Sequence, residues 1–208
     1  MHPGGGDRRS DRGGIGRKDH HRRICHMREI KQVRLSGFGG QGVVLAGVLL
    51  GQAGASEGKY VSGSNSYGAQ ARGSSCKSEI VLSDGPIDFP HLVIADLLVA
   101  MSQGSYNLYC KDVREGSGLI LYDPGLVTPK EGRRVRHIGI PATEVSLKRL
   151  KNKQVANIVV LGALIETTGL VSEKAMKRAI TMHVSERFQS LNLKALRLGM
   201  ELGRKTHG

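Results

Sequence analysis

The order of apolar and polar residues along the chain alternates short apolar runs with longer amphipathic segments. The apolar runs predict strands at Ile30–Leu35, Tyr60–Ser62, Cys76–Ser83, His91–Ala95, Gly118–Tyr122 and Val135–Ile140. The amphipathic segments predict helices at Gln41–Ala55, Leu97–Asn107, Ala142–Leu150, Gln154–Thr167, Ser172–Val184 and Leu193–Gly203, with Asp96 as an N-cap. This alternation predicts an α/β fold: an open, mostly parallel, Rossmann-like sheet with helices on both faces and a helical C-terminal part.

A glycine-rich stretch separates the first predicted strand from the first predicted helix. It comprises Gly37, Phe38, Gly39, Gly40, Gln41 and Gly42. Glycine adopts positive φ readily, and the N-terminal N–H groups of a helix attract anions, so the turn is a candidate site for a phosphate or carboxylate. An alternative is that the glycines only allow the helix to pack closely on the strand.

The same stretch also matches the G-x-G-x-x-G pattern of dinucleotide-binding proteins at Gly37, Gly39 and Gly42. A site for NAD also needs an acidic residue at the end of the second strand, where it binds the ribose. The second predicted strand ends without one, and Glu57 precedes that strand. The pattern therefore indicates the anion-binding half of such a site without the ribose-binding half.

A long polar segment, Asn65–Ser75, follows the second predicted strand. Segments of this length within a compact domain are often functional. The candidate ligand-binding residues are Tyr67, Gly68, Arg72, Gly73 and Ser74. A guanidinium beside a glycine can reach a phosphate or carboxylate with little hindrance, although a solvated loop arginine is the alternative. We expect the first two strands to be neighbours in the sheet. Because this segment and the glycine turn both follow the carboxyl ends of these strands, we expect them to share one crevice.

The amino-acid composition and net charge limit the kinds of molecule that this chain is expected to bind. The 208 residues carry a formal net charge of +13, only 4% are aromatic, and no apolar stretch is long enough for a membrane span. We predict that residues 1–28 form a disordered basic tail and that residues 29–205 form one folded domain. A diffuse positive charge suits polyanionic small ligands or acidic proteins. We expect neither a nucleic-acid nor a membrane partner, and a cytoplasmic location.

The residues that usually carry catalysis do not form a recognisable set. Cys25, Cys76 and Cys110 are far apart and form no C-x-x-C pair, so we expect this chain to hold no zinc or iron–sulfur cluster of its own. We assign no catalytic residue and no metal ligand. A binding site without evident catalytic groups is typical of a subunit that completes the active site of another chain.

Several motifs in order resemble the gamma subunit of the 2-oxoacid:ferredoxin oxidoreductases. They are Gly37–Gly42, Ser66–Gly68, Arg72–Gly73, Ile80–Asp84, Asn157–Ala163 and Asn192–Gly199, and the resemblance spans about residues 29–203. The family usually has Pro-Glu after Tyr-Gly and a second glycine after Arg-Gly. This chain has Ala69-Gln70 and Ser74 there, so no acidic role is expected at position 70.

The resemblance implies a function within a complex. Such complexes oxidatively decarboxylate a 2-oxoacid to an acyl-CoA, using thiamine diphosphate, coenzyme A and [4Fe–4S] clusters, and pass electrons to ferredoxin. The thiamine and the clusters belong to partner subunits, namely alpha, beta and a ferredoxin-like delta subunit. The resemblance favours 2-oxoglutarate over pyruvate as the substrate. An indolepyruvate oxidoreductase subunit and a stand-alone nucleotide-binding protein are the alternatives.

Overall fold

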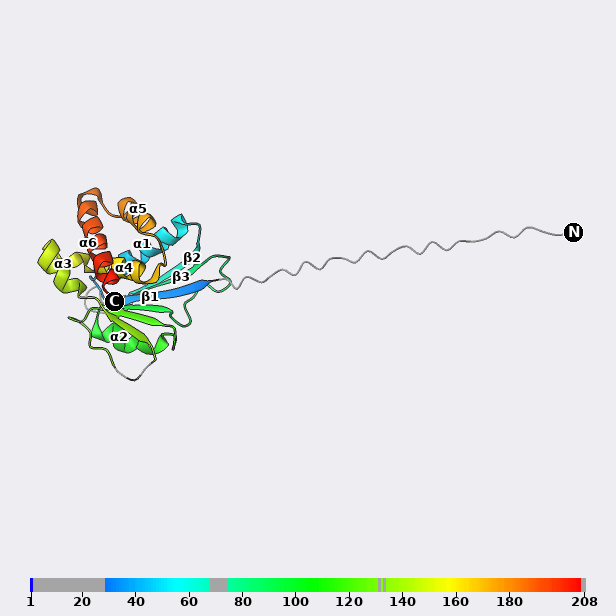
Figure 1. The fold of residues 1–208 in the computed structure, drawn as a ribbon, viewed down its shortest axis with the longest axis horizontal. Helices are drawn as coiled ribbons and strands as arrows, with labels where there is room; N and C mark the ends of the chain where they lie inside the picture. The colour runs from blue at the N-terminus through cyan, green and yellow to red at the C-terminus, as the bar shows by residue number, and fades with distance from the viewer. Residues whose placement is uncertain (2–28, 68–74, 131, 133, 207–208) are drawn as a thin grey trace.

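A computed structural model describes residue 1 and residues 29–67, 75–130, 132 and 134–206. Its centre is one six-stranded sheet (Figure 1) with the strand order β2-β3-β1-β4-β5-β6. The strands are β1 (Ile30–Phe38), β2 (Tyr60–Tyr67), β3 (Ser75–Ser83), β4 (Leu97–Ala100), β5 (Leu119–Tyr122) and β6 (Arg136–Gly139).

The strand directions confirm the prediction of an open, mostly parallel sheet. β1, β4, β5 and β6 pair in parallel, and β3 runs antiparallel to both β1 and β2. Five of the six strands therefore point the same way. The expectation that the first two strands are neighbours is wrong, because β3 lies between β1 and β2. The carboxyl ends of β1 and β2 nevertheless lie at the same end of the sheet, beside the start of β3. Phe38 lies opposite Ser75 there, and Tyr67 lies opposite Cys76.

Helices cover both faces of the sheet, but unequally (Figure 1). One face carries α1 (Val43–Ser56), α3 (Ala142–Leu150), α4 (Ala156–Thr168), α5 (Glu173–His183) and α6 (Glu186–Arg204). The other face carries the short α2 (Gln103–Tyr109), which is followed by the 3-10 turn Cys110–Asp112. A second 3-10 turn, Lys153–Val155, leads into α4. No helix among the described residues is both long and apolar enough to cross a membrane.

Each face has its own apolar core. The larger core lies between the sheet and α1, α4 and α6, and it includes Val33, Leu49 and Leu161. The smaller core lies under α2 and includes Leu98 and Tyr106. Alternate residues of a strand point to opposite faces, and the strands β4 and β5 supply apolar side chains to both cores. This is why β4 and β5 are continuous apolar runs in the sequence.

The sequence prediction is wrong in the segment between β3 and α2. The apolar run Leu97–Ala100, expected to begin a helix, is the buried central strand β4, and the expected strand His91–Ala95 makes only an isolated bridge from Ala95 to Val113. The helix begins six residues later than expected, at Gln103, where the Ser102 hydroxyl accepts a hydrogen bond from the Ser105 N–H. Asp96 instead accepts a hydrogen bond from the Gln32 N–H at 2.8 Å.

Candidate functional site

The glycine turn connects the end of β1 to the start of α1. Gly40 and Gly42 adopt φ values of 95° and 71°, in the left-handed region that favours glycine. The carbonyl of Gly42 accepts a hydrogen bond of 2.9 Å from Nδ2 of Asn157, near the start of α4. A Cβ atom on Gly42 would lie 2.3 Å from that nitrogen. Glycine is therefore needed there for its conformation and for space, and the turn is anchored to α4.

Gln41 bridges the ends of two parallel strands. Its Oε1 accepts a hydrogen bond of 2.6 Å from the N–H of Phe38, and its Nε2 donates one of 2.8 Å to the carbonyl of Met101, which follows β4. A Cβ on Gly37 would lie 2.4 Å from Gln41 Oε1, so glycine at position 37 makes room for this side chain. The Phe38 N–H and the Met101 carbonyl are thus bonded to Gln41.

A cleft of about 390 Å³ opens beside this turn. It is lined by Gly39, Gly40, Gln41, Met101, Leu126, Thr143, Lys153, Gln154 and Ala156. The cleft lies at the carboxyl ends of the parallel strands. It is next to β1, the strand at which the order of the sheet reverses, because β3 and β2 lie on one side of β1 and β4 lies on the other. Ligands of open α/β sheets usually bind at such a point. Among these lining residues, Lys153 carries the one charged side chain, and it is exposed.

The structure separates the predicted site residues into three groups. Gly39, Gly40 and Gln41 line the cleft, whereas Gly37 and Gly42 shape the turn beneath it. Tyr67 is exposed at the end of the edge strand β2 and does not belong to the described lining of the cleft. Gly68, Arg72, Gly73 and Ser74 lie outside the described residues, so their place in a shared crevice stays a prediction.

Comparison with known proteins adds a decisive observation to this geometry. The sequence profile of the pyruvate ferredoxin/flavodoxin oxidoreductase family matches residues 32–202. The chain belongs to this family. The 2-oxoglutarate synthase subunit KorC of Methanocaldococcus jannaschii is 43% identical over 178 residues, which cover 84% of this chain and 95% of that protein. The family resemblance found in the sequence is therefore confirmed.

Two further relatives support the assignment to this family. The ketoisovalerate oxidoreductase subunit VorA of Methanothermobacter marburgensis is 36% identical over 183 residues, which cover 86% of this chain but 37% of that protein. A crystal structure of a keto/oxoacid ferredoxin oxidoreductase gamma subunit from Geobacter sulfurreducens superposes with a TM-score of 0.77 at 36% identity. That superposition covers 85% of this chain and 98% of the other. The fold of this chain therefore matches that of the gamma subunit over nearly the whole length of that subunit.

Sequence reasoning missed several residues that build the site of this oxidoreductase family member. Asn157 stands within a motif that carried the resemblance, but no role was assigned to it. Thr143 and Lys153 were not singled out, although both come shortly after predicted strands or before predicted helices. The rule that ligands bind at the carboxyl ends of parallel strands could have directed attention to Thr143, because it follows the last strand by only four residues.

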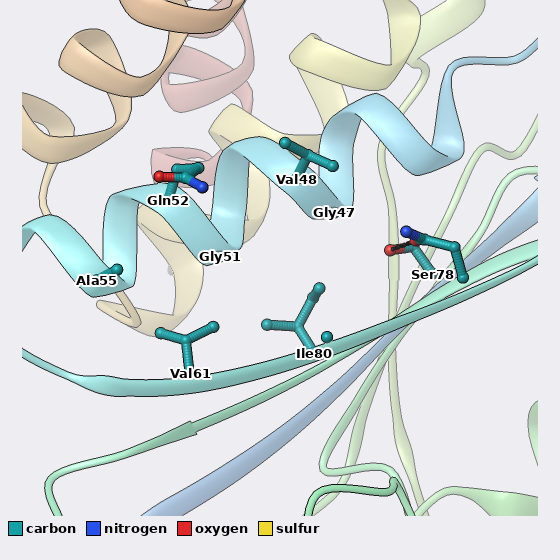
Figure 2. A pocket seen from close by; sticks show the side chains of 10 residues that line it. Gly47, Val48, Gly51, Gln52, Ala55, Val61, Ser78 and Ile80 are labelled. Atoms are coloured by element: carbon teal, nitrogen blue, oxygen red, sulfur yellow. Dashed lines mark hydrogen bonds between the residues drawn. The ribbon is translucent and has the colours of Figure 1, made fainter.

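A second cleft lies away from the glycine turn. It has a volume of about 370 Å³ and opens between α1 and the strands β2 and β3 (Figure 2). Its lining, which includes Gly47, Gly51, Val61 and Ile80, has no titratable side chain. The side chains that line this cleft therefore offer no general acid or base, and the cleft at the glycine turn remains the candidate functional site.

The potential metal ligands of the described residues do not gather at one place. They include no group of three or more His, Cys, Asp or Glu side chains placed to hold a metal ion. Cys76 is buried on β3, and burial raises the pKa of its thiol. A raised pKa disfavours the reactive thiolate, so Cys76 is a packing residue.

Proposed function

We propose that this chain is the gamma subunit of a thiamine diphosphate-dependent 2-oxoacid:ferredoxin oxidoreductase whose substrate is 2-oxoglutarate. The complex would decarboxylate the 2-oxoacid, form an acyl-CoA and reduce ferredoxin. The KorC protein supports this choice of substrate, because the match extends over 95% of its length at 43% identity. The match to VorA is lower in identity and covers a smaller share of that protein.

Within this complex, the proposed role of the chain is to bind and orient coenzyme A. The observation that carries this role is Lys153, the charged side chain beside an exposed glycine turn in the cleft. No atom lies within 4 Å of the position that a Cβ on Gly40 would occupy, so the backbone there is open to a ligand. An ammonium group and nearby backbone N–H groups are suited to binding a phosphate by charge-assisted hydrogen bonds.

The described part of this chain does not offer the ligands of an iron–sulfur cluster. A [4Fe–4S] cluster needs several cysteine ligands close together, and the described cysteines, Cys76 and Cys110, are both buried at different places in the fold. We therefore propose that the clusters belong to the alpha, beta and ferredoxin-like delta subunits. The family resemblance implies the same for thiamine diphosphate. These subunits and ferredoxin are the proposed partners, in the cytoplasm.

Two features oppose a stand-alone dinucleotide-binding protein. The strand that would carry the ribose-binding acid is not adjacent to β1, since β3 lies between β1 and β2. The side chain of Gln41 also bonds to the Phe38 N–H and the Met101 carbonyl at the centre of the turn. The Phe38 N–H is therefore not free to donate a hydrogen bond to a pyrophosphate. Titration of the isolated chain with NAD is expected to show no binding.

The role of Lys153 is tested by the substitution Lys153→Gln in the purified complex. We expect the KM for coenzyme A to rise about tenfold, equivalent to about 1.4 kcal/mol, because a charge-assisted hydrogen bond is lost. The KM for the 2-oxoacid should change little. Lys194→Gln on α6 is the matched control, since Lys194 is also an exposed lysine but lies outside the cleft. An unchanged KM for coenzyme A in Lys153→Gln would contradict the proposed role.

Arg72 is tested in the same assay. We propose that its guanidinium binds either a phosphate of coenzyme A or the carboxylate of the 2-oxoacid. The substitution Arg72→Ala should raise the KM for whichever substrate it contacts, and the assay therefore distinguishes the two ligands. An Arg72→Ala complex with wild-type KM values for both substrates would refute a binding role.

A further inference from the structure

The outer strand β2 has an unprotected edge. It forms one border of the sheet and pairs with β3 on one side only, within the part of the chain that the structure describes. Its eight residues, Tyr60–Tyr67, include no charged residue and no proline. Sheet edges are usually protected by charges, prolines or bulges, because their free N–H and C=O groups can pair with another strand. β2 has the length and composition of a strand that accepts such a partner.

On the face of the sheet that carries α1, the surface beside this edge is also without charge. On the other face, Lys77 and Glu79 of β3 lie beside β2. The 14 residues of α1 include no acidic or basic side chain, and neither does the lining of the cleft between α1, β2 and β3. Figure 2 shows Gly47 and Gly51 of α1 facing Val61 and Ile80 across this cleft. Two copies of a chain with a net charge of +13 repel each other. The repulsion between nearby side chains is smallest where both surfaces are uncharged, as they are on the α1 face of this edge.

We propose that two copies of this chain associate through their β2 edges, as antiparallel strands around a two-fold axis. Such an axis is perpendicular to the sheet, so opposed residues must point to the same face. The register centred on Ser64 places Ser64 opposite itself and Val61 opposite Tyr67 of the second copy. This register pairs seven residues, from Val61 to Tyr67 of each strand, and extends one sheet of six strands into a sheet of twelve.

The position of Tyr67 favours the Ser64-centred register over the other possible registers. Its side chain is 69% exposed, and it shares a face with Val61 because it lies opposite the core residue Cys76. In the Ser64-centred register, the ring of Tyr67 packs on Val61 of the second copy, at the mouth of the uncharged cleft. A register centred on Gly63 would leave Tyr67 outside the paired strands. Pairs of an aromatic and a β-branched residue across strands are stabilising.

Disulfide trapping tests the register directly. In the full-length chain with Cys25→Ser, a Ser64→Cys substitution should give a cross-linked species of twice the 22.4 kDa chain mass on a non-reducing gel. Cys76 and Cys110 are buried and do not compete. Ser62→Cys is the control, because Ser62 faces Ser66 of the second copy and cannot reach its own equivalent. Equal cross-linking at both positions, or none at Ser64, would overturn the proposal.

Sedimentation velocity tests the association without cysteine chemistry. The wild-type chain should sediment increasingly as a dimer as its concentration rises. Tyr67→Lys should shift it to the monomer, because it places a charge against Val61 of the second copy. Tyr60→Lys is the matched control, since Tyr60 is 50% exposed and lies outside the seven paired residues. A chain that stays monomeric, or a dimer that Tyr67→Lys leaves intact, would refute the proposal. Neither result depends on the activity of the complex.

Discussion

At the scale of single residues, the most distinctive feature outside the cleft is a buried ion pair across two strands. Arg34 on β1 lies opposite Glu79 on β3, and its Nε donates to Glu79 Oε1 at 2.8 Å. The side chains of Arg34 and Glu79 are only 6% and 11% exposed. Arg34 also bonds to Asp112 after α2 at 3.0 Å and lies 4.6 Å from the centre of the Tyr109 ring. The pair therefore connects the sheet to the α2 region.

This pair predicts a specific dependence of stability on pH. Burial alone raises the pKa of Glu79, but hydrogen bonds and charge interactions with Lys77 and Arg34 outweigh it, so its pKa in the folded state is below the usual value. A lowered pKa stabilises the fold above the unfolded-state value of about 4.3, and that contribution is lost as the pH falls through the folded-state pKa. We expect the free energy of unfolding of the wild type to fall on acidification below about pH 5.

The substitution Glu79→Gln isolates this contribution. It should destabilise the chain by about 2 kcal/mol at pH 7, because a charged hydrogen bond to a buried arginine is lost, and its stability should depend less steeply on pH below 5. Urea unfolding at several pH values measures both effects. Glu144→Gln, at an exposed helical glutamate, should keep the wild-type slope. A wild-type slope in Glu79→Gln would show that this carboxylate is not the group responsible.

The sequence predicted which residues form the turn but only part of what they do. Four glycines around Phe38 and Gln41 correctly indicated a sharp connection between a strand and a helix. The need for glycine at position 37 comes from Gln41, whose side chain folds back to bond with Phe38 and Met101. Met101 is 60 residues from Gln41 in the chain. A contact over that separation depends on the pairing of β1 with β4, which local patterns do not reveal.

At the scale of elements, α4 and α6 pack with their backbones in close approach. A Cβ on Gly199 of α6 would lie 1.9 Å from the carbonyl oxygen of Val159 in α4. A Cβ on Gly162 of α4 would lie 2.3 Å from the carbonyl oxygen of Leu196 in α6. Glycine on each helix thus makes room for the backbone of the other. This contact supports the start of α4, where Asn157 anchors the glycine turn.

The substitution Gly199→Ala should therefore destabilise the fold. The added methyl group meets backbone rather than a movable side chain, so the helices must separate, and we expect a loss of about 3 kcal/mol or somewhat more. Ser190→Ala, at an exposed position of the same helix, should change the free energy of unfolding by less than about 0.5 kcal/mol. Thermal or urea unfolding compares the two. Wild-type stability in Gly199→Ala would contradict the close approach of the two helices.

The elements were predicted well where their patterns were long and poorly where they were short. The helices α3, α4 and α5 and the strands β1, β3, β5 and β6 lie close to their predicted positions. The last helix, α6, begins at Glu186, seven residues before its predicted start. β4 was assigned to a helix because Leu97–Ala100 is a four-residue apolar run, and such a run has no periodicity that separates a buried strand from a buried helix. β2 extends to Tyr67, five residues beyond its predicted end, because pairing with β3 overrides its weak glycine- and serine-rich pattern.

At the scale of the whole molecule, the candidate site is assembled from distant parts of the sequence. The glycine turn, the residue after β4, the start of α3 and the turn before α4 meet at one end of the sheet. The fold class, the glycine turn and the family were predictable from the sequence. The contribution of Lys153 was not, because its distance from the turn depends on how α4 packs against α6 and the sheet.

The most direct test of this account is an assay of the native complex that contains this chain. The complex, purified through an affinity tag on the chain, would be supplied with coenzyme A and oxidised ferredoxin and tested with 2-oxoglutarate, pyruvate and 2-oxoisovalerate. We predict reduction of ferredoxin that requires coenzyme A and is fastest with 2-oxoglutarate. A chain that purifies without partner subunits, or a complex that reduces ferredoxin with none of the three acids, would contradict the proposed function.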